Sequence, residues 1–173
     1  MRVIAGRFKG RTLRAPKGMR TRPTADRVRE ALFSMLGEVS GARVLDLYAG
    51  SGALGIEALS RGAVSAVFVE RDARAASAIR DNLRALGLEQ AVRRQDALRF
   101  LGATEGTFDL VFCDPPYDSV PRIAGPLAER LPALLSQGAR IVTESDKRMP
   151  LELPFELLVE RTYGDTRIAI HAR

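Results

Sequence analysis

The chain has little of the chemistry that stabilises small secreted or metal-binding proteins. Its 173 residues include one cysteine, Cys113, one histidine, His171, and no tryptophan. A lone cysteine cannot form an internal disulfide, and one Cys with one His offers too few ligands for a zinc site. The sequence also lacks the ~18 uninterrupted apolar residues of a membrane span and the apolar stretch of a secretion signal. We therefore expect a soluble cytoplasmic protein with no bound metal and no membrane association.

The composition, with 46% hydrophobic residues, suits one sizeable core. We expect a single domain over residues 1–173, in which residues 1–37 form a basic hairpin and helix and residues 38–173 form the core. Residues 1–30 carry ten Lys and Arg against two acidic residues, a local net charge of +8, although the whole chain carries only +6. This concentration favours a nucleic-acid-binding arm, and a solvated basic tail is the alternative.

The pattern of apolar residues predicts the elements of an α/β fold. Two short β segments, 2–5 and 11–13, flank a turn, and a helix with Thr24 as its N-cap follows Pro23 and stops at Gly37. Strands and helices then alternate, with strands at 43–47, 66–69, 91–94, 110–113 and 139–143 and helices at 54–61, 73–86, 97–101 and 123–135. The last two strands, 155–160 and 166–171, form a hairpin. The sequence thus predicts a seven-stranded, mostly parallel sheet with an antiparallel C-terminal hairpin.

A glycine-rich loop follows the first core strand. Gly50, Gly52 and Gly55 fit the G-x-G-x-x-G spacing between a strand and a helix, where backbone N–H groups can approach a nucleotide-like ligand. Glu70 ends the next strand about 20 residues later, where a carboxylate can accept hydrogen bonds from ribose hydroxyls. Asp96 follows the third strand and can either reach an adenine amino group or cap the next helix. These residues alone do not separate a dinucleotide from S-adenosylmethionine.

The fourth strand delivers Asp114, Pro115, Pro116 and Tyr117 to the sheet edge where ligands of α/β proteins bind. The amino nitrogen of a base is a poor nucleophile because its lone pair is delocalised into the ring. The Asp114 carboxylate and the Pro115 carbonyl can hold both amino hydrogens, so that the lone pair points at a methyl donor. Tyr117 offers a face for stacking a flipped-out base. This motif favours S-adenosylmethionine over a nicotinamide cofactor.

Cys113 adjoins this motif, which raises the alternative of a thiolate nucleophile, as in C5 pyrimidine methylation. Its place in an apolar strand favours a buried, inert thiol instead. His171 lies on the last strand and is interpreted as structural or surface.

These motifs, in this order, resemble the class I Rossmann-fold methyltransferases that modify amino groups. Three further segments, 2–11, 22–33 and 163–166, make the whole chain similar to the bacterial RsmD family of 16S ribosomal RNA guanine-N2 methyltransferases. Ser34 departs from the family, in which Asn commonly follows the Leu-Phe pair.

The resemblance implies a cofactor, a substrate and a set of site residues. The cofactor is S-adenosyl-L-methionine, and the cofactor-binding residues are Asp46, Tyr48, Gly50, Ser51, Gly52, Glu70, Arg71, Asp96 and Ala97. The catalytic residues are Asp114, Pro115 and Tyr117. The residues that would contact RNA are Arg2, Arg7, Lys9, Arg11, Arg20, Arg22 and Arg27. The expected partner is the small ribosomal subunit or its assembly intermediate, approached by a monomer.

Other functions stay open on the sequence. An adenine-N6 methyltransferase of DNA or RNA and a protein glutamine methyltransferase use similar Pro-Pro-Tyr motifs, but the first lacks a DNA-recognition module here and the second leaves the basic arm unexplained. A nicotinamide oxidoreductase would explain the glycine-rich loop and Glu70 but not the motif at Asp114 to Tyr117. A non-catalytic RNA-binding assembly factor leaves the glycine loop unexplained.

Overall fold

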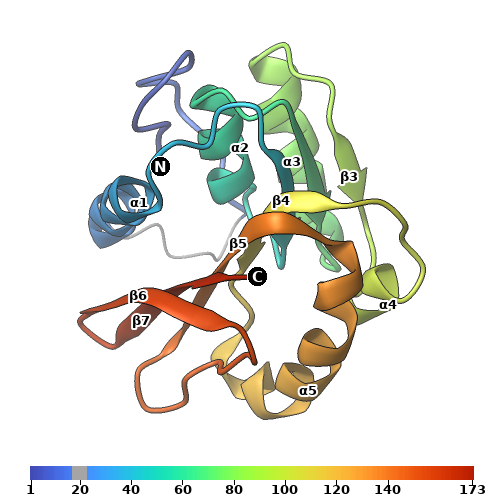
Figure 1. The fold of residues 1–173 in the computed structure, drawn as a ribbon. Helices are drawn as coiled ribbons and strands as arrows, with labels where there is room; N and C mark the ends of the chain where they lie inside the picture. Colours follow the sequence, from blue (N-terminus) through green and yellow to red (C-terminus); the bar gives the residue numbers. More distant parts are fainter. Residues whose placement is uncertain (17–22) are drawn as a thin grey trace.

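The computed structural model describes residues 1–16 and 23–173, and within this part of the chain seven strands form one sheet (Figure 1). The strand order is β3-β2-β1-β4-β5-β7-β6. The strands are β1 (Arg43–Leu47), β2 (Ser65–Val69), β3 (Ala91–Arg93), β4 (Phe108–Cys113), β5 (Leu135–Asp146), β6 (Glu156–Tyr163) and β7 (Thr166–Ala172). The first five pair in parallel, and β7 runs antiparallel to both β5 and β6. The predicted α/β fold with its C-terminal hairpin is confirmed.

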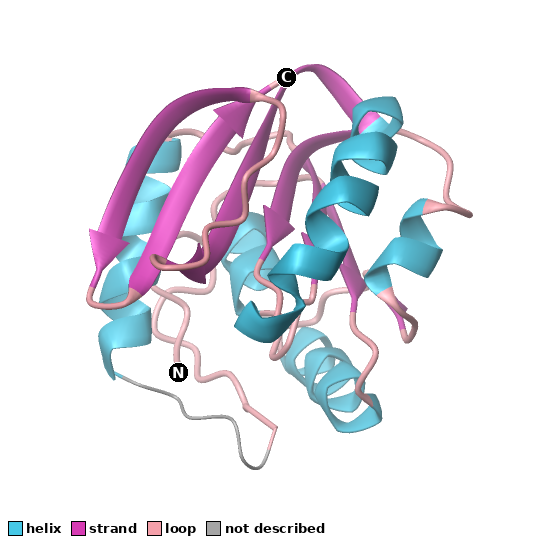
Figure 2. Cartoon of the chain, turned by 90° about the horizontal axis from the view of Figure 1, so that it is seen from below, coloured by secondary structure: helices cyan, strands magenta, loops and turns pink. Residues whose placement is uncertain are grey.

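Helices cover both faces of this sheet (Figure 2). On one face, α1 (Pro23–Leu36), α2 (Ala53–Ser60) and α3 (Ala73–Ala85) contribute Phe33, Ile56 and Ile79 to a buried cluster. On the other face, α4 (Ala97–Leu101) and α5 (Val120–Arg130) contribute Phe100 and Leu127 to a second cluster. Because both faces are covered, the central strands read as apolar runs rather than as alternating patterns. None of the described helices is long and apolar enough to span a membrane.

The structure corrects several predicted boundaries. The helix predicted at 123–135 begins at Val120 and ends at Arg130, and a 3-10 turn over Leu131–Leu134 leads directly into β5. Pro132 lacks the N–H that another α-helical turn requires, which explains the early end. β5 is far longer than the predicted 139–143, because its pairing with β7 continues to Asp146. Thr24 is not the N-cap, since α1 begins at Pro23, whose fixed φ suits the first helical position.

The N-terminal segment is packed onto the core. Arg2 forms an antiparallel bridge with Thr12, which is the predicted hairpin in its shortest form. Val3 and Leu13 are buried in the cluster under α1, α2 and α3. At Gly6 a Cβ atom would lie 1.8 Å from the Ser60 carbonyl oxygen, so this close approach requires glycine. The alternative of a solvated tail is therefore wrong for residues 1–14.

Polar side chains of α2 and α3 hold the backbone of this segment. The Glu57 carboxylate accepts the N–H groups of Ile4 and Ala5 at 2.8 and 3.0 Å. Asn82 accepts the Arg14 N–H at 2.8 Å and donates to the carbonyls of Arg14 and Ser51 at 3.0 and 3.1 Å. Because Ser51 belongs to the glycine-rich loop, Asn82 joins the basic segment to that loop.

Glu57 also neutralises two cations. Its carboxylate lies 2.8 Å from Nε of Arg61 and 3.7 Å from Nε of the buried Arg29. Arg29 in turn lies 3.1 Å from Asp26 on its own helix. Glu57 is fully buried and therefore links α1, α2 and the N-terminal segment through one side chain.

Replacing Glu57 should destabilise the fold. Glu57→Gln keeps the size of the side chain and removes the buried anion, so Arg61 loses its carboxylate partner and the buried Arg29 keeps Asp26 but loses one of its two. We expect a loss of about 3 kcal/mol in the free energy of unfolding, measured by urea denaturation. The matched control, Glu105→Gln at an exposed position, should change it by less than about 0.5 kcal/mol. Equal stability of the two variants would contradict this account of Glu57.

Candidate active site

The glycine-rich loop leaves β1 at the point where the strand order reverses between β1 and β4, the usual ligand crevice of such sheets. Gly52 has φ +77°, a conformation that L side chains rarely adopt. Tyr48 has φ +58°, the one positive φ of a non-glycine residue among those described. Its hydroxyl is buried without a hydrogen-bond partner in the described residues, and burial raises the pKa of Tyr48. Strain of this kind concentrates at functional sites.

Two carboxylates brace this loop. The buried Asp46 accepts the Gly55 N–H at 2.9 Å. Burial, reinforced by the charges of Asp114 and Glu70, outweighs this hydrogen bond and raises the pKa of Asp46 to about 8. Glu70 accepts the N–H groups of Gly50 and Asp72 at 2.9 and 2.8 Å. Both acidic residues thus fix the backbone that a nucleotide-like ligand would approach.

The remaining predicted cofactor residues lie around this loop and at the end of β3. Ser51 is buried and its hydroxyl faces the Met1 sulfur at 3.4 Å. Asp96 caps α4 by accepting the Arg99 N–H at 3.0 Å, which agrees with the capping role, and its second oxygen accepts no hydrogen bond from the described residues. Ala97 is buried and Arg71 is exposed.

The Asp-Pro-Pro-Tyr segment occupies the carboxyl end of β4. Asp114 is half-buried, and burial raises its pKa. Pro115 is buried, whereas Tyr117 begins a short 3-10 turn, Tyr117–Ser119, with its ring partly exposed. The Tyr117 hydroxyl lies 3.2 Å from the Thr166 hydroxyl, so the motif is tied to the start of β7.

The structure adds one acidic residue that the sequence did not reveal. Cys113 pairs with Thr143 in the parallel ladder, so the next residues, Asp114 just past the end of β4 and Glu144 within β5, are neighbours. Burial and the Asp114 charge raise the pKa of Glu144. A single Glu in an apolar strand carries no motif, and only the pairing of β4 with β5 shows its place.

The two residues considered for other chemistry are inert. Cys113 is 1% exposed, and burial raises its pKa well above the usual range, so the thiolate that C5 methylation needs is disfavoured. His171 is buried near the C-terminal end of β7. The site lies at the opposite end of this strand, where Thr166 contacts Tyr117. Within residues 1–16 and 23–173, no group of three His, Cys, Asp or Glu side chains could hold a metal.

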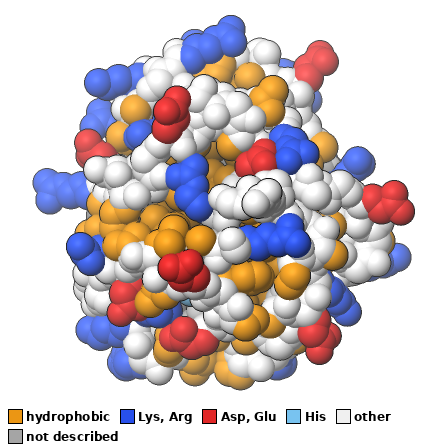
Figure 3. Space-filling model, viewed as in Figure 1, with side chains coloured by type: hydrophobic (Ala, Val, Ile, Leu, Met, Phe, Trp, Pro, Cys, Tyr) orange, Lys and Arg blue, Asp and Glu red, His pale blue; other side chains and the backbone are white. Residues whose placement is uncertain are grey.

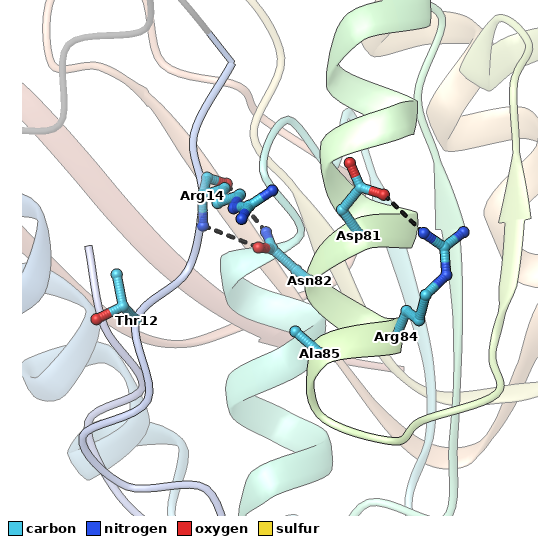
Figure 4. Close-up of a pocket in the computed structure, with 6 residues that line it drawn as sticks. All are labelled: Thr12, Arg14, Asp81, Asn82, Arg84 and Ala85. Atoms are coloured by element: carbon cyan, nitrogen blue, oxygen red, sulfur yellow. Dashed lines mark hydrogen bonds and ion pairs between the residues drawn. The ribbon is translucent and has the colours of Figure 1, made fainter.

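The predicted RNA-contacting residues fall into three groups. Arg2, Arg7, Lys9 and Arg27 are exposed. Arg11 donates to the Ala85 carbonyl at 2.9 Å, and a groove of about 270 Å³ lies beside it. Figure 4 shows the residues lining this groove between the N-terminal segment and α3, which are Thr12, Arg14, Asp81, Asn82, Arg84 and Ala85. Arg20 and Arg22 lie outside the described residues.

Comparison with known proteins shows the family. The family model described as "Conserved hypothetical protein 95" matches residues 1–172. The chain belongs to this family. It is 39% identical to ribosomal RNA small subunit methyltransferase D of Haemophilus influenzae, over 95% of this chain and 89% of that protein. It is also 43% identical to YlbH of Bacillus subtilis, over 100% and 99% of the two chains. The predicted membership of the RsmD family is confirmed.

Solved structures agree with this assignment. The yhhF protein of Escherichia coli superposes with a TM-score of 0.87 at 33% identity, covering 100% of this chain and 97% of that one. A Thermus thermophilus 16S rRNA N2 G1207 methyltransferase, RsmC, solved with AdoMet and guanosine, gives a TM-score of 0.69 at 26% identity over 91% of this chain and 44% of that one. The class I methyltransferase fold is therefore confirmed.

The inert state of Cys113 can be tested directly. Because the thiol is buried and its pKa is raised, the native protein should react with iodoacetamide at pH 8 at least about 100-fold more slowly than the urea-unfolded protein. Mass spectrometry of the intact chain measures this ratio, and the single cysteine makes the readout unambiguous. Rapid native alkylation would reopen a nucleophilic role.

Proposed function

We propose that this chain transfers a methyl group from S-adenosylmethionine to the exocyclic N2 of a guanine in the 16S RNA of the small ribosomal subunit. The observation that carries the proposal is the half-buried Asp114 at the carboxyl end of β4, next to the glycine-rich loop at the end of β1. The Haemophilus influenzae relative named above is described as a small-subunit ribosomal RNA methyltransferase. The RsmC structure contains AdoMet and guanosine on the same fold.

The residues around the loop fit S-adenosylmethionine. The cofactor supplies a methyl group on a sulfonium cation, and it carries an ammonium group on its methionine part. Asp46, Glu70 and Asp114 surround the crevice with acidic groups, and the charges of Asp114 and Glu70 add to the burial that raises the pKa of Asp46. A cationic ligand relieves this repulsion. Asp46 and residues 50–52 would hold the methionine part, Glu70 the ribose, and Asp96 the adenine.

The target amine would be held by Asp114 and Pro115. Ionised Asp114 accepts one amino hydrogen, and the Pro115 carbonyl accepts the other. Both amino hydrogens are then engaged, and the nitrogen lone pair turns out of the base plane toward the methyl donor. Most of the rate enhancement therefore comes from orientation and charge placement rather than from a covalent intermediate. The Tyr117 ring, tethered through Thr166, offers the stacking face for an extruded base.

The basic N-terminal segment supports an RNA substrate. Its arginines and Lys9 point to solvent while its backbone is held by Glu57 and Asn82, so the charges are displayed on a fixed scaffold. The link through Asn82 to Ser51 places this scaffold next to the cofactor loop. A fixed array of cations suits a folded RNA whose backbone has a defined shape.

The same contacts support the remaining expectations. The N-terminal segment buries apolar residues in the core cluster, which favours one domain over residues 1–173 acting as a monomer. The proposed partner is the small subunit or its assembly intermediate in the cytoplasm, where ribosomal RNA is exposed to modification. An adenine-N6 methyltransferase and a non-catalytic assembly factor are the alternatives that the first experiment separates.

The first experiment is a methyl-transfer assay. We expect labelled S-adenosylmethionine to give N2-methylguanosine in 16S RNA or small subunits from cells lacking the protein, and no label in DNA or protein. Asp114→Ala should lower the rate at least about 1,000-fold because it removes an acceptor needed in the transition state, while cofactor affinity stays within about threefold. Label in N6-methyladenine would support an adenine-N6 methyltransferase. Normal ribosome assembly in cells that carry only the Asp114→Ala variant would support a non-catalytic assembly factor.

Cofactor affinity should depend on pH through Asp46. With a pKa of about 8, this carboxyl is protonated and neutral at lower pH, and a cation binds its ionised form better. The affinity for S-adenosylmethionine should therefore rise about tenfold between about pH 6.0 and pH 7.5, and binding should release a proton. Calorimetry in two buffers of different ionisation enthalpy measures both the affinity and the proton release. Asp46→Asn, which can still accept from Gly55, should flatten the profile. A flat profile in the unmodified protein would contradict the raised pKa.

A further inference from the structure

Two carboxylates at the substrate end of the sheet differ from the other acidic residues of the site. Asp46, Glu70 and Asp96 each accept a backbone N–H group. Asp114 and Glu144 accept no hydrogen bond from any residue in the described parts of the chain. Burial raises the pKa of both, and the Asp114 charge raises that of Glu144 further. Water can supply donors to such half-buried carboxylates, so a ligand that covers them and excludes the water must bring donors of its own.

The sheet directs both carboxylates to one face. Phe112 on β4 and Val142 on β5 are buried in the cluster under α1, α2 and α3. Side chains alternate along a strand, so Asp114 and Glu144, two residues further on, point to the same face in neighbouring positions. Figure 3 shows apolar side chains gathered between α1 and the β6–β7 hairpin.

Tyr117 extends across this pair. Tyr117 follows the end of β4, and its hydroxyl lies next to the Thr166 hydroxyl on β7. β5, which carries Glu144, lies between β4 and β7 in the sheet. A base stacked on Tyr117 with its amino group at Asp114 therefore has Glu144 as the next group along its edge.

Resting on the proposed function, we propose that Glu144 is a specificity-determining residue that accepts the N1–H of the target guanine while Asp114 accepts from its N2 amino group.

The chemistry of the bases favours this assignment. Guanine presents a ring N–H beside its exocyclic amine, so its edge offers donors to two adjacent carboxylates. Adenine and cytosine place an unprotonated ring nitrogen beside their amines, and that lone pair would face Glu144. An ionised carboxylate only accepts hydrogen bonds, and the N1–H of guanine stabilises this form of Glu144 against the burial that raises its pKa, whereas the ring nitrogens of adenine and cytosine offer it no donor.

The test compares two substrates and two proteins. The RNA identified by nucleoside analysis is prepared with guanine or 2-aminopurine at the target position, since 2-aminopurine keeps the N2 amine and lacks the N1 hydrogen. The unmodified protein should prefer guanine by about 100-fold in kcat/KM. Glu144→Gln should lower kcat/KM on the guanine substrate by about 10- to 100-fold. It should also reduce the preference for guanine over 2-aminopurine at least about tenfold, because its amide N–H can donate to N1 of 2-aminopurine.

The controls separate this role from a structural one. Glu144→Gln should retain the cofactor affinity of the unmodified protein, and Glu105→Gln should retain both rates. An unchanged guanine preference in Glu144→Gln, or an equal loss on both substrates, would overturn the inference while leaving N2 methylation intact. If the unmodified protein forms no N2-methylguanosine, the proposed function is wrong, and the proposed role of Glu144 is wrong as well.

Discussion

The parallel pairing of β1 with β4 is the constraint on which the site depends. It aligns Asp46 with Phe112 and Leu47 with Cys113, so that the glycine-rich loop and the Asp-Pro-Pro-Tyr segment emerge at the same edge. These two segments are more than 60 residues apart in sequence. Their proximity is stabilised by apolar contacts on both faces, where Phe112 and Val111 enter opposite clusters. A site of this kind is as rigid as the centre of the sheet.

The site concentrates acidic side chains in a region that the fold buries. Asp46, Asp114 and Glu144 all have raised pKa values with burial as the largest cause. Such an arrangement is unfavourable in the free protein, and a cationic cofactor and a donor-rich base edge both relieve it. The excess of positive charge lies elsewhere, in residues 1–30. This separation supports the proposal that the crevice takes the cofactor and the base and that the basic segment meets the RNA backbone.

Much of this architecture could be predicted because each βα unit has a local signature. β1 and α4 match their predicted ranges, since the apolar run of residues 43–47 and the cap at Asp96 are local features. Predictions failed where long-range pairing decided the outcome. β5 continues to Asp146 because β7 pairs with it, and it begins at Leu135, which pairs with Phe108 of β4. The docking of residues 1–14 depends on Glu57 and Asn82, whose partners are more than 50 residues away.

The sequence by itself determined the class of fold, the family and the motifs that carry chemistry, because a glycine-rich loop, an acidic strand end and two adjacent prolines act through local backbone geometry. Only the tertiary structure decided which carboxylates are engaged and which are free. Glu70 and Glu144 are equally plain in the sequence, yet the first is held by backbone N–H groups, and the second stands beside Asp114 with no donor from residues 1–16 or 23–173. The physical reason is that hydrogen-bond satisfaction depends on neighbours across the sheet, which strand register places and residue spacing does not.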